Sequence, residues 1–91
     1  MLLLCRPSVP TVLRIDGLRV IIYTSDHWPA HVHIRGNGKE ALFYLNCPDG
    51  PPELRGNFRF NPSELTRIQA KLAPHVAALC AAWKEMHGYN E

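Results

Sequence analysis

Hydrophobic and polar residues alternate in short runs through the first half of the chain, which is the pattern of half-buried β-strands. The four runs lie at residues 11–15, 18–24, 31–35 and 40–46. Asp16-Gly17 is a two-residue hairpin signal, and Gly36-Asn37-Gly38-Lys39 is typical of a second turn. The pattern therefore predicts an antiparallel meander.

The hydrophobic period changes after residue 60 from that of a strand to that of a helix. Asn61 can cap the helix, Pro62 fits its first turn, and Glu64 completes a capping box. Apolar residues then recur at steps of three and four and form one stripe. They are Leu65, Ile68, Leu72, Val76, Leu79, Trp83 and Met86. We expect the helix to end at Gly88. Pro74 should kink or split the helix, because proline removes one helical hydrogen bond.

The segment between Cys47 and Asn61 is rich in Pro, Gly, Asp and Arg, so we expect it to be a loop. The elements together predict an α+β fold of two layers: an antiparallel four-stranded β-meander with a long, Pro-kinked C-terminal helix packed on one face. A chain of 91 residues has room for one domain. We place it at 10–91 and expect 1–9 to be a loose N-terminal extension.

Composition and charge exclude several classes of protein. Hydrophobic residues make up 46% and charged residues 20% of the chain, which argues against disorder. The net charge of +2 is too small to indicate nucleic-acid binding by itself. The three cysteines are widely spaced, which argues against a disulfide scaffold and fits a reducing cytoplasm. Without a signal peptide or a membrane-length apolar run, the chain is expected to be soluble and cytoplasmic.

The most unusual segment is Ser25-Asp26-His27-Trp28-Pro29-Ala30-His31-Val32-His33, where three of the five histidines and a carboxylate lie together. Period-two alternation places His31, His33 and Arg35 on the strand face opposite the core. His27, His31 and His33, or Asp26 in place of His27, would make a three-ligand metal site with an open position for water. Zinc or a similar ion would suit these ligands.

Two alternatives do not need a metal. In one, the face is functional without an ion: His31 and His33 act as general acid and base, and Arg35 stabilises charge on a phosphate, as metal-independent RNA cleavage requires. Further binding contacts would then come from Asp26, His27, Trp28 and Arg59. In the other, the histidines have a purely structural role, capping the loop or stacking on Trp28.

The segments from Pro10-Thr11-Val12-Leu13-Arg14 through the His-x-His strand to Asn61-Pro62-Ser63-Glu64-Leu65 and Trp83 resemble a family of small bacterial proteins. This is the domain of unknown function family numbered 4160. Ala30 stands where the family pattern has a second proline, whereas both histidines are present. The resemblance implies a two-protein module like a toxin–antitoxin pair, with a cognate small protein encoded nearby.

These features lead to one principal functional hypothesis and two alternatives. The principal hypothesis is a toxin-type or effector partner of such a module, acting through the His31, His33 and Arg35 face on RNA. The alternatives are a protein-binding module without chemistry and a metal-dependent hydrolase. Ile21 and Tyr23 lie on the strand face that the helix leaves uncovered, which predicts a homodimer or a tight heterocomplex.

Overall fold

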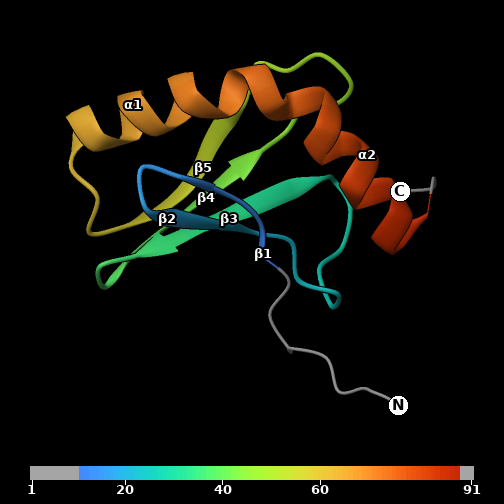
Figure 1. Ribbon diagram of the computed structural model, residues 1–91, viewed down its shortest axis with the longest axis horizontal. Coiled ribbons are helices and arrows are strands. Elements are labelled where there is room, and N and C mark those ends of the chain that lie inside the picture. Colours follow the sequence, from blue (N-terminus) through green and yellow to red (C-terminus); the bar gives the residue numbers. More distant parts are fainter. Residues whose placement is uncertain (1–10, 89–91) are drawn as a thin grey trace.

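The computed structural model describes residues 11–88, which form a five-stranded antiparallel sheet covered by a helical layer (Figure 1). The strands are β1 (Thr11–Ile15), β2 (Leu18–Ile21), β3 (His31–Gly36), β4 (Lys39–Tyr44) and β5 (Glu53–Phe58). Neighbours in sequence are neighbours in the sheet, in the order β1-β2-β3-β4-β5. The expected α+β meander is therefore confirmed. The expected extension at 1–9 lies outside the described residues.

The expected number of four strands is wrong, because β5 lies inside the segment predicted to be a loop. β5 is an edge strand that pairs with β4 alone, and its register shifts between Leu42 and Phe43 of β4. Most of its side chains are exposed, so no alternation of apolar residues marks it. Prolines precede the strand without interrupting it, and an edge position tolerates the polar sequence.

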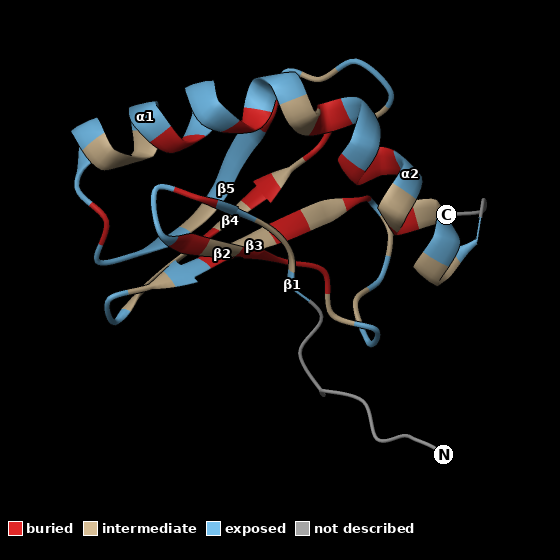
Figure 2. Cartoon of the chain, viewed as in Figure 1, coloured by how far each residue is buried: buried red, intermediate tan, exposed pale blue. Residues whose placement is uncertain are grey.

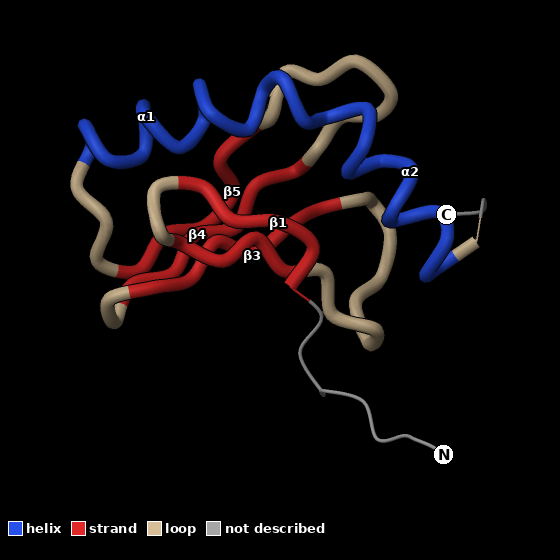
Figure 3. Tube along the Cα trace, viewed as in Figure 1, coloured by secondary structure: helices blue, strands red, loops and turns tan. Residues whose placement is uncertain are grey.

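The helical layer is split at the proline, as expected. Helix α1 (Pro62–Leu72) leads through a 3₁₀ turn (Ala73–His75) into α2 (Val76–His87) (Figure 3). Asn61 and Glu64 form the predicted capping box. The Lys39 ammonium, 2.8 Å from the Glu64 carboxylate, and the backbone N–H of Asn61 lower the pKa of Glu64. This ion pair joins the start of α1 to the β3–β4 hairpin.

The core lies between the sheet and the helical layer, where buried residues from both meet (Figure 2). On β3, Val32 and Ile34 are fully buried against this layer. His31, His33 and Arg35 alternate with them and lie on the opposite side of the sheet, which we call the open face. The predicted alternation of buried and outward side chains on this strand is therefore confirmed.

One expectation about the open face is wrong. Ile21 pairs with His33 across β2 and β3, yet it is completely buried within the single chain. Tyr23 is half-buried and packs its ring against that of His33. Because Ile21 offers no exposed apolar surface, it gives no argument for association. The homodimer or heterocomplex stays a prediction.

The expectation against a disulfide is also wrong. Cys47, just after β4, is bonded to Cys80 of α2, and their Cα atoms lie 5.8 Å apart. Nothing in the sequence indicates this bond, because the two cysteines are far apart in the chain. They meet only because the helical layer folds back over the end of β4. The cysteines therefore no longer support a reducing compartment. None of the helices within residues 11–88 is long and apolar enough to cross a membrane.

Removing the disulfide should destabilise the protein substantially. The two cysteines are 33 positions apart, and opening a loop of that size in the unfolded chain costs about 3–4 kcal/mol of stability. We expect a Cys47→Ser/Cys80→Ser variant to lose this amount in urea denaturation, with Cys5→Ser as a control. Three free thiols in the denatured, unreduced chain would contradict the disulfide.

Candidate metal centre

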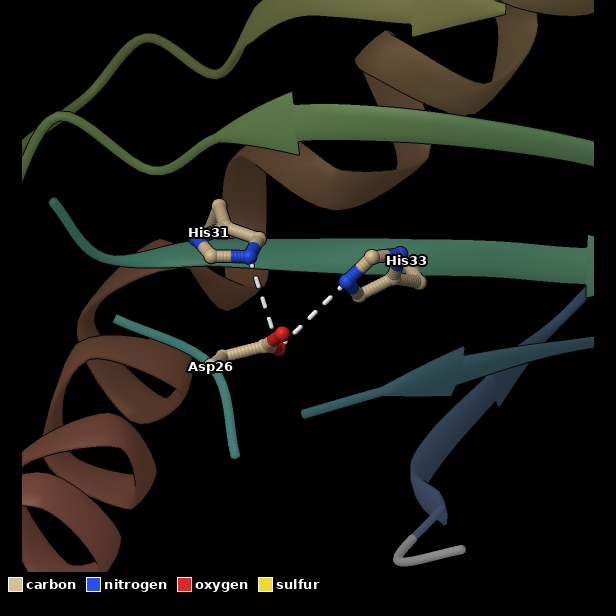
Figure 4. Close-up of side chains that lie close together, drawn as sticks. All are labelled: Asp26, His31 and His33. Carbon is tan, nitrogen blue, oxygen red and sulfur yellow. Dashed lines mark ion pairs between the residues drawn. The ribbon is translucent and has the colours of Figure 1, made fainter. Parts of the chain in front are cut away.

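Asp26, His31 and His33 converge on the open face (Figure 4). Both histidines come from β3, and Asp26 comes from the loop between β2 and β3. The Asp26 Oδ2 atom lies 3.4 Å from His31 Nε2 and 3.3 Å from His33 Nε2. One donor atom from each of the three residues lies within 4.8 Å of the others. The group is thus compact enough to share one ion.

A local turn aims the Asp26 carboxylate at the histidines. The Asp26 N–H donates to the Tyr23 carbonyl at 3.1 Å, and the Tyr23 N–H donates to Asp26 Oδ2 at 3.1 Å. Aspartate commonly makes such local side-chain bonds to the backbone in turns. The carboxylate is therefore held in place before any ligand is bound.

The outer nitrogen of each imidazole is held by an acceptor. His31 Nδ1 lies 2.9 Å from the Pro29 carbonyl oxygen, and His33 Nδ1 lies 3.2 Å from Glu40 Oε2. A carbonyl and an ionised carboxylate can only accept hydrogen bonds, so each Nδ1 carries the proton and donates it. In the neutral ring, each Nε2 then presents a lone pair toward Asp26. A carboxylate or carbonyl in this outer position is the usual partner of a metal-binding histidine.

The inner nitrogen of His33 lacks the hydrogen bond that its distance to Asp26 would allow. His33 Nε2 is buried and has no hydrogen-bond partner, although Asp26 Oδ2 is only 3.3 Å away. Two acceptors facing each other at this distance repel, whereas a cation between them would bind both. Ligand atoms at about 2.0–2.1 Å from a tetrahedral ion lie roughly 3.3 Å apart, which matches the two contacts with Asp26.

Solvent can still reach the cluster. The side chains of His31, His33 and Asp26 are 12%, 14% and 15% exposed. Three protein ligands leave at least one coordination position of a zinc-like ion unfilled. The arrangement can therefore hold both an ion and a water molecule or substrate atom bound to it.

Aromatic rings from α2 support the cluster from the side of the helical layer. The Trp83 ring is completely buried and lies 5.1 Å from the His31 ring and 5.6 Å from the Trp28 ring. His87 packs on Trp83 at 4.1 Å, and its Nε2 lies 3.2 Å from the Tyr23 carbonyl oxygen. Trp83, predicted as part of the apolar stripe of the helix, is thus a core residue that also touches the site.

Arg35 borders the cluster and is linked to it through Glu40 and Tyr23. Its Nη1 donates to the Tyr23 hydroxyl at 2.9 Å, and its Nε lies 3.6 Å from Glu40 Oε1. The hydrogen bond to Tyr23, with smaller contributions from the charges of Tyr23 and Glu40, raises the pKa of Arg35. Glu40 thus contacts both a candidate ligand and the neighbouring cation.

The structure brings some of the predicted site residues together and not others. Of the two candidates for the third ligand, Asp26 joins the histidines, whereas His27 is exposed and outside the cluster. Trp28 contacts Trp83 and lines a separate cavity of about 510 Å³. The Arg59 guanidinium lies over the Phe58 ring, and no contact among residues 11–88 joins it to the histidines.

Sequence reasoning overlooked Glu40 and Tyr23 as parts of the site. Glu40 could have been found from the hairpin turn, because its register pairs Arg35 with Glu40 and brings the carboxylate beside His33. Tyr23 carried no such signal. Its role depends on the shape of the loop, which alternation does not predict.

The family comparison agrees with the resemblance drawn from the sequence. The model of the Domain of unknown function (DUF4160) matches residues 17–84, and the chain belongs to this family. The matched segment includes the three cluster residues, Glu40 and both disulfide cysteines. No curated protein and no solved structure matches the chain.

Proposed function

We propose that the protein is a metal-dependent hydrolase whose ion is held by Asp26, His31 and His33. The observation that carries this proposal is the buried His33 Nε2, which lies 3.3 Å from Asp26 Oδ2 without a hydrogen bond, while His31 Nε2 lies 3.4 Å from the same oxygen. A bound metal ion would give His33 Nε2 the partner that it lacks without one.

The donor set selects the class of ion. Two imidazole nitrogens and one carboxylate oxygen suit zinc, and similar sets hold iron(II) and related borderline ions. Such an ion, when bound, lowers the pKa of a coordinated water enough for it to act as a nucleophile near neutral pH. Partial exposure of the cluster leaves room for that water and for a substrate.

The surrounding residues of the chain would orient these ligands. Glu40 and the Pro29 carbonyl hold the outer nitrogens of the two rings. The Tyr23 N–H holds the carboxylate, and Trp83 packs against the His31 ring on the buried side. The ligands are therefore preorganised by contacts that do not depend on the ion.

The first test of this proposal is metal binding. Purified protein should carry close to one zinc-like ion per chain, and added zinc should raise its melting temperature. His33→Ala and Asp26→Asn should abolish both effects, whereas His27→Ala should retain them because His27 is exposed and outside the cluster.

Elemental analysis without metal, together with an unchanged melting temperature on adding zinc, would overturn the proposal. RNA cleavage that persists in chelator would favour the metal-free acid–base alternative on His31 and His33.

The second test concerns the outer carboxylate. Glu40→Gln should weaken zinc binding roughly 10- to 100-fold, because the amide orients His33 and increases its basicity less than a carboxylate does. Calorimetric titration of the metal-free protein measures the change. Glu53→Gln, on exposed β5, is the matched control. Equal affinities for Glu40→Gln and the control would exclude an orienting role for Glu40.

We also propose that the protein is the toxin-type partner of a two-protein module and that the metal-dependent hydrolysis is its toxic activity. Expression of the chain alone should then arrest bacterial growth, and the protein encoded nearby should relieve the arrest. His33→Ala should abolish toxicity and His27→Ala should preserve it. Binding to the neighbouring protein without any toxicity would favour the docking module instead.

A further inference from the structure

A row of arginines crosses the open face beside the candidate metal centre. The register pairs Arg14 of β1 with Arg19 of β2, and Arg19 with Arg35 of β3. Residues paired across strands lie on the same face of the sheet, and neighbouring strands are about 4.8 Å apart. We call Arg14, Arg19 and Arg35 the arginine row.

Like charges placed directly opposite each other destabilise a sheet unless something neutralises them. Arg35 is paired with Glu40, whereas neither Arg14 nor Arg19 has an ion pair or hydrogen bond with any of residues 11–88. The unpaired guanidinium groups of Arg14 and Arg19 thus stand in one row with that of Arg35. An anionic ligand with several charges would compensate this repulsion.

The row continues beyond its cations to an exposed aromatic ring. Arg35 pairs with Glu40, and Glu40 pairs with Phe58 of the edge strand β5, whose side chain is 59% exposed. A cavity of about 330 Å³ lies along this line and includes Arg19, Arg35 and Phe58 in its lining. Guanidinium groups that follow a phosphate backbone, with exposed aromatic rings for stacking, are how proteins bind single-stranded nucleic acids.

We propose that the arginine row binds the phosphate backbone of a single-stranded nucleic acid and leads it to the candidate metal centre. The inference deepens the proposed function, on which it rests for the reaction. Arg35 is two residues from His33 on the same face, so a strand held by the row passes beside the cluster.

The reaction that this geometry assigns is hydrolysis of a phosphodiester. The oxygen of water bonds to phosphorus and one P–O ester bond breaks. One proton of the water passes to the departing ester oxygen, and the other remains with the new phosphate or is lost to solvent. No oxidant or further reactant is needed.

The inference is tested by measuring how the full chain binds labelled oligouridine and oligothymidine of twelve nucleotides. Fluorescence anisotropy reports the binding. Arg14→Gln and Arg19→Gln should each weaken binding about tenfold, since each removes a charge-assisted contact. The double variant should also lower the slope of log affinity against log salt by about 1.4, or roughly 0.7 per lost phosphate contact. Arg67→Gln is the matched control, because Arg67 is exposed on α1 and carries the same charge.

Unchanged affinity and salt slope in the double variant would overturn the inference. So would equal binding of poly-glutamate or of inorganic phosphate, because either would show a general anion surface. A preference between the two oligonucleotides would identify RNA or DNA as the ligand, and equal binding would assign the shared phosphate backbone.

The same samples separate this inference from the proposed function. Metal content of the Arg14→Gln/Arg19→Gln variant should equal that of the unaltered protein. Arginine-dependent binding by a protein that holds no metal would refute the metal centre alone. A metal-loaded protein that binds neither oligonucleotide would refute the arginine row alone.

Discussion

The burial of Val32 and Ile34 on β3 is the constraint on which the site depends. Both side chains are completely buried, and β3 is bonded on both sides, to β2 and to β4. Because a strand has a period of two, a slip by one residue would exchange every buried side chain with an outward one. It would place His31 and His33 in the core without partners, at a high cost in free energy. The hydrophobic contacts of β3 therefore determine where the imidazole rings lie.

The same constraint explains why the helical layer reaches the site. The break at Pro74 lets α2 descend beyond the end of the sheet where β3 begins (Figure 1). Trp83 is thereby buried against the core and in contact with the His31 ring. The disulfide at Cys80 lies one turn before Trp83 and ties α2 to the end of β4. Packing and a covalent bond thus hold one wall of the cluster, while hydrogen bonds hold its loop.

The parts of this arrangement that could be predicted are those that depend on local pattern. Alternation from His31 to Arg35 correctly separated the buried side of β3 from its outward side, and Asn61 and Glu64 correctly marked the start of the helix. The sequence could not decide whether Asp26 or His27 is the third ligand. That depends on the turn at Tyr23, which directs Asp26 toward the histidines and leaves His27 exposed. The disulfide depended on tertiary contact between distant segments. β5 could not be predicted, because it forms by pairing with β4 and an exposed edge strand needs no hydrophobic pattern of its own.

The charges of the open face also have a common logic. With an ion bound, Asp26 would neutralise part of the charge of the ion, and Glu40 is already shared between His33 and Arg35. Neither carboxylate is then free to neutralise Arg14 or Arg19, so the face around the centre would be positive as a whole. A small net charge on the entire chain conceals this local excess, since most of its acidic residues lie elsewhere. The field next to the candidate centre therefore favours substrates with several negative charges, and an isolated neutral ester or amide would gain nothing from it.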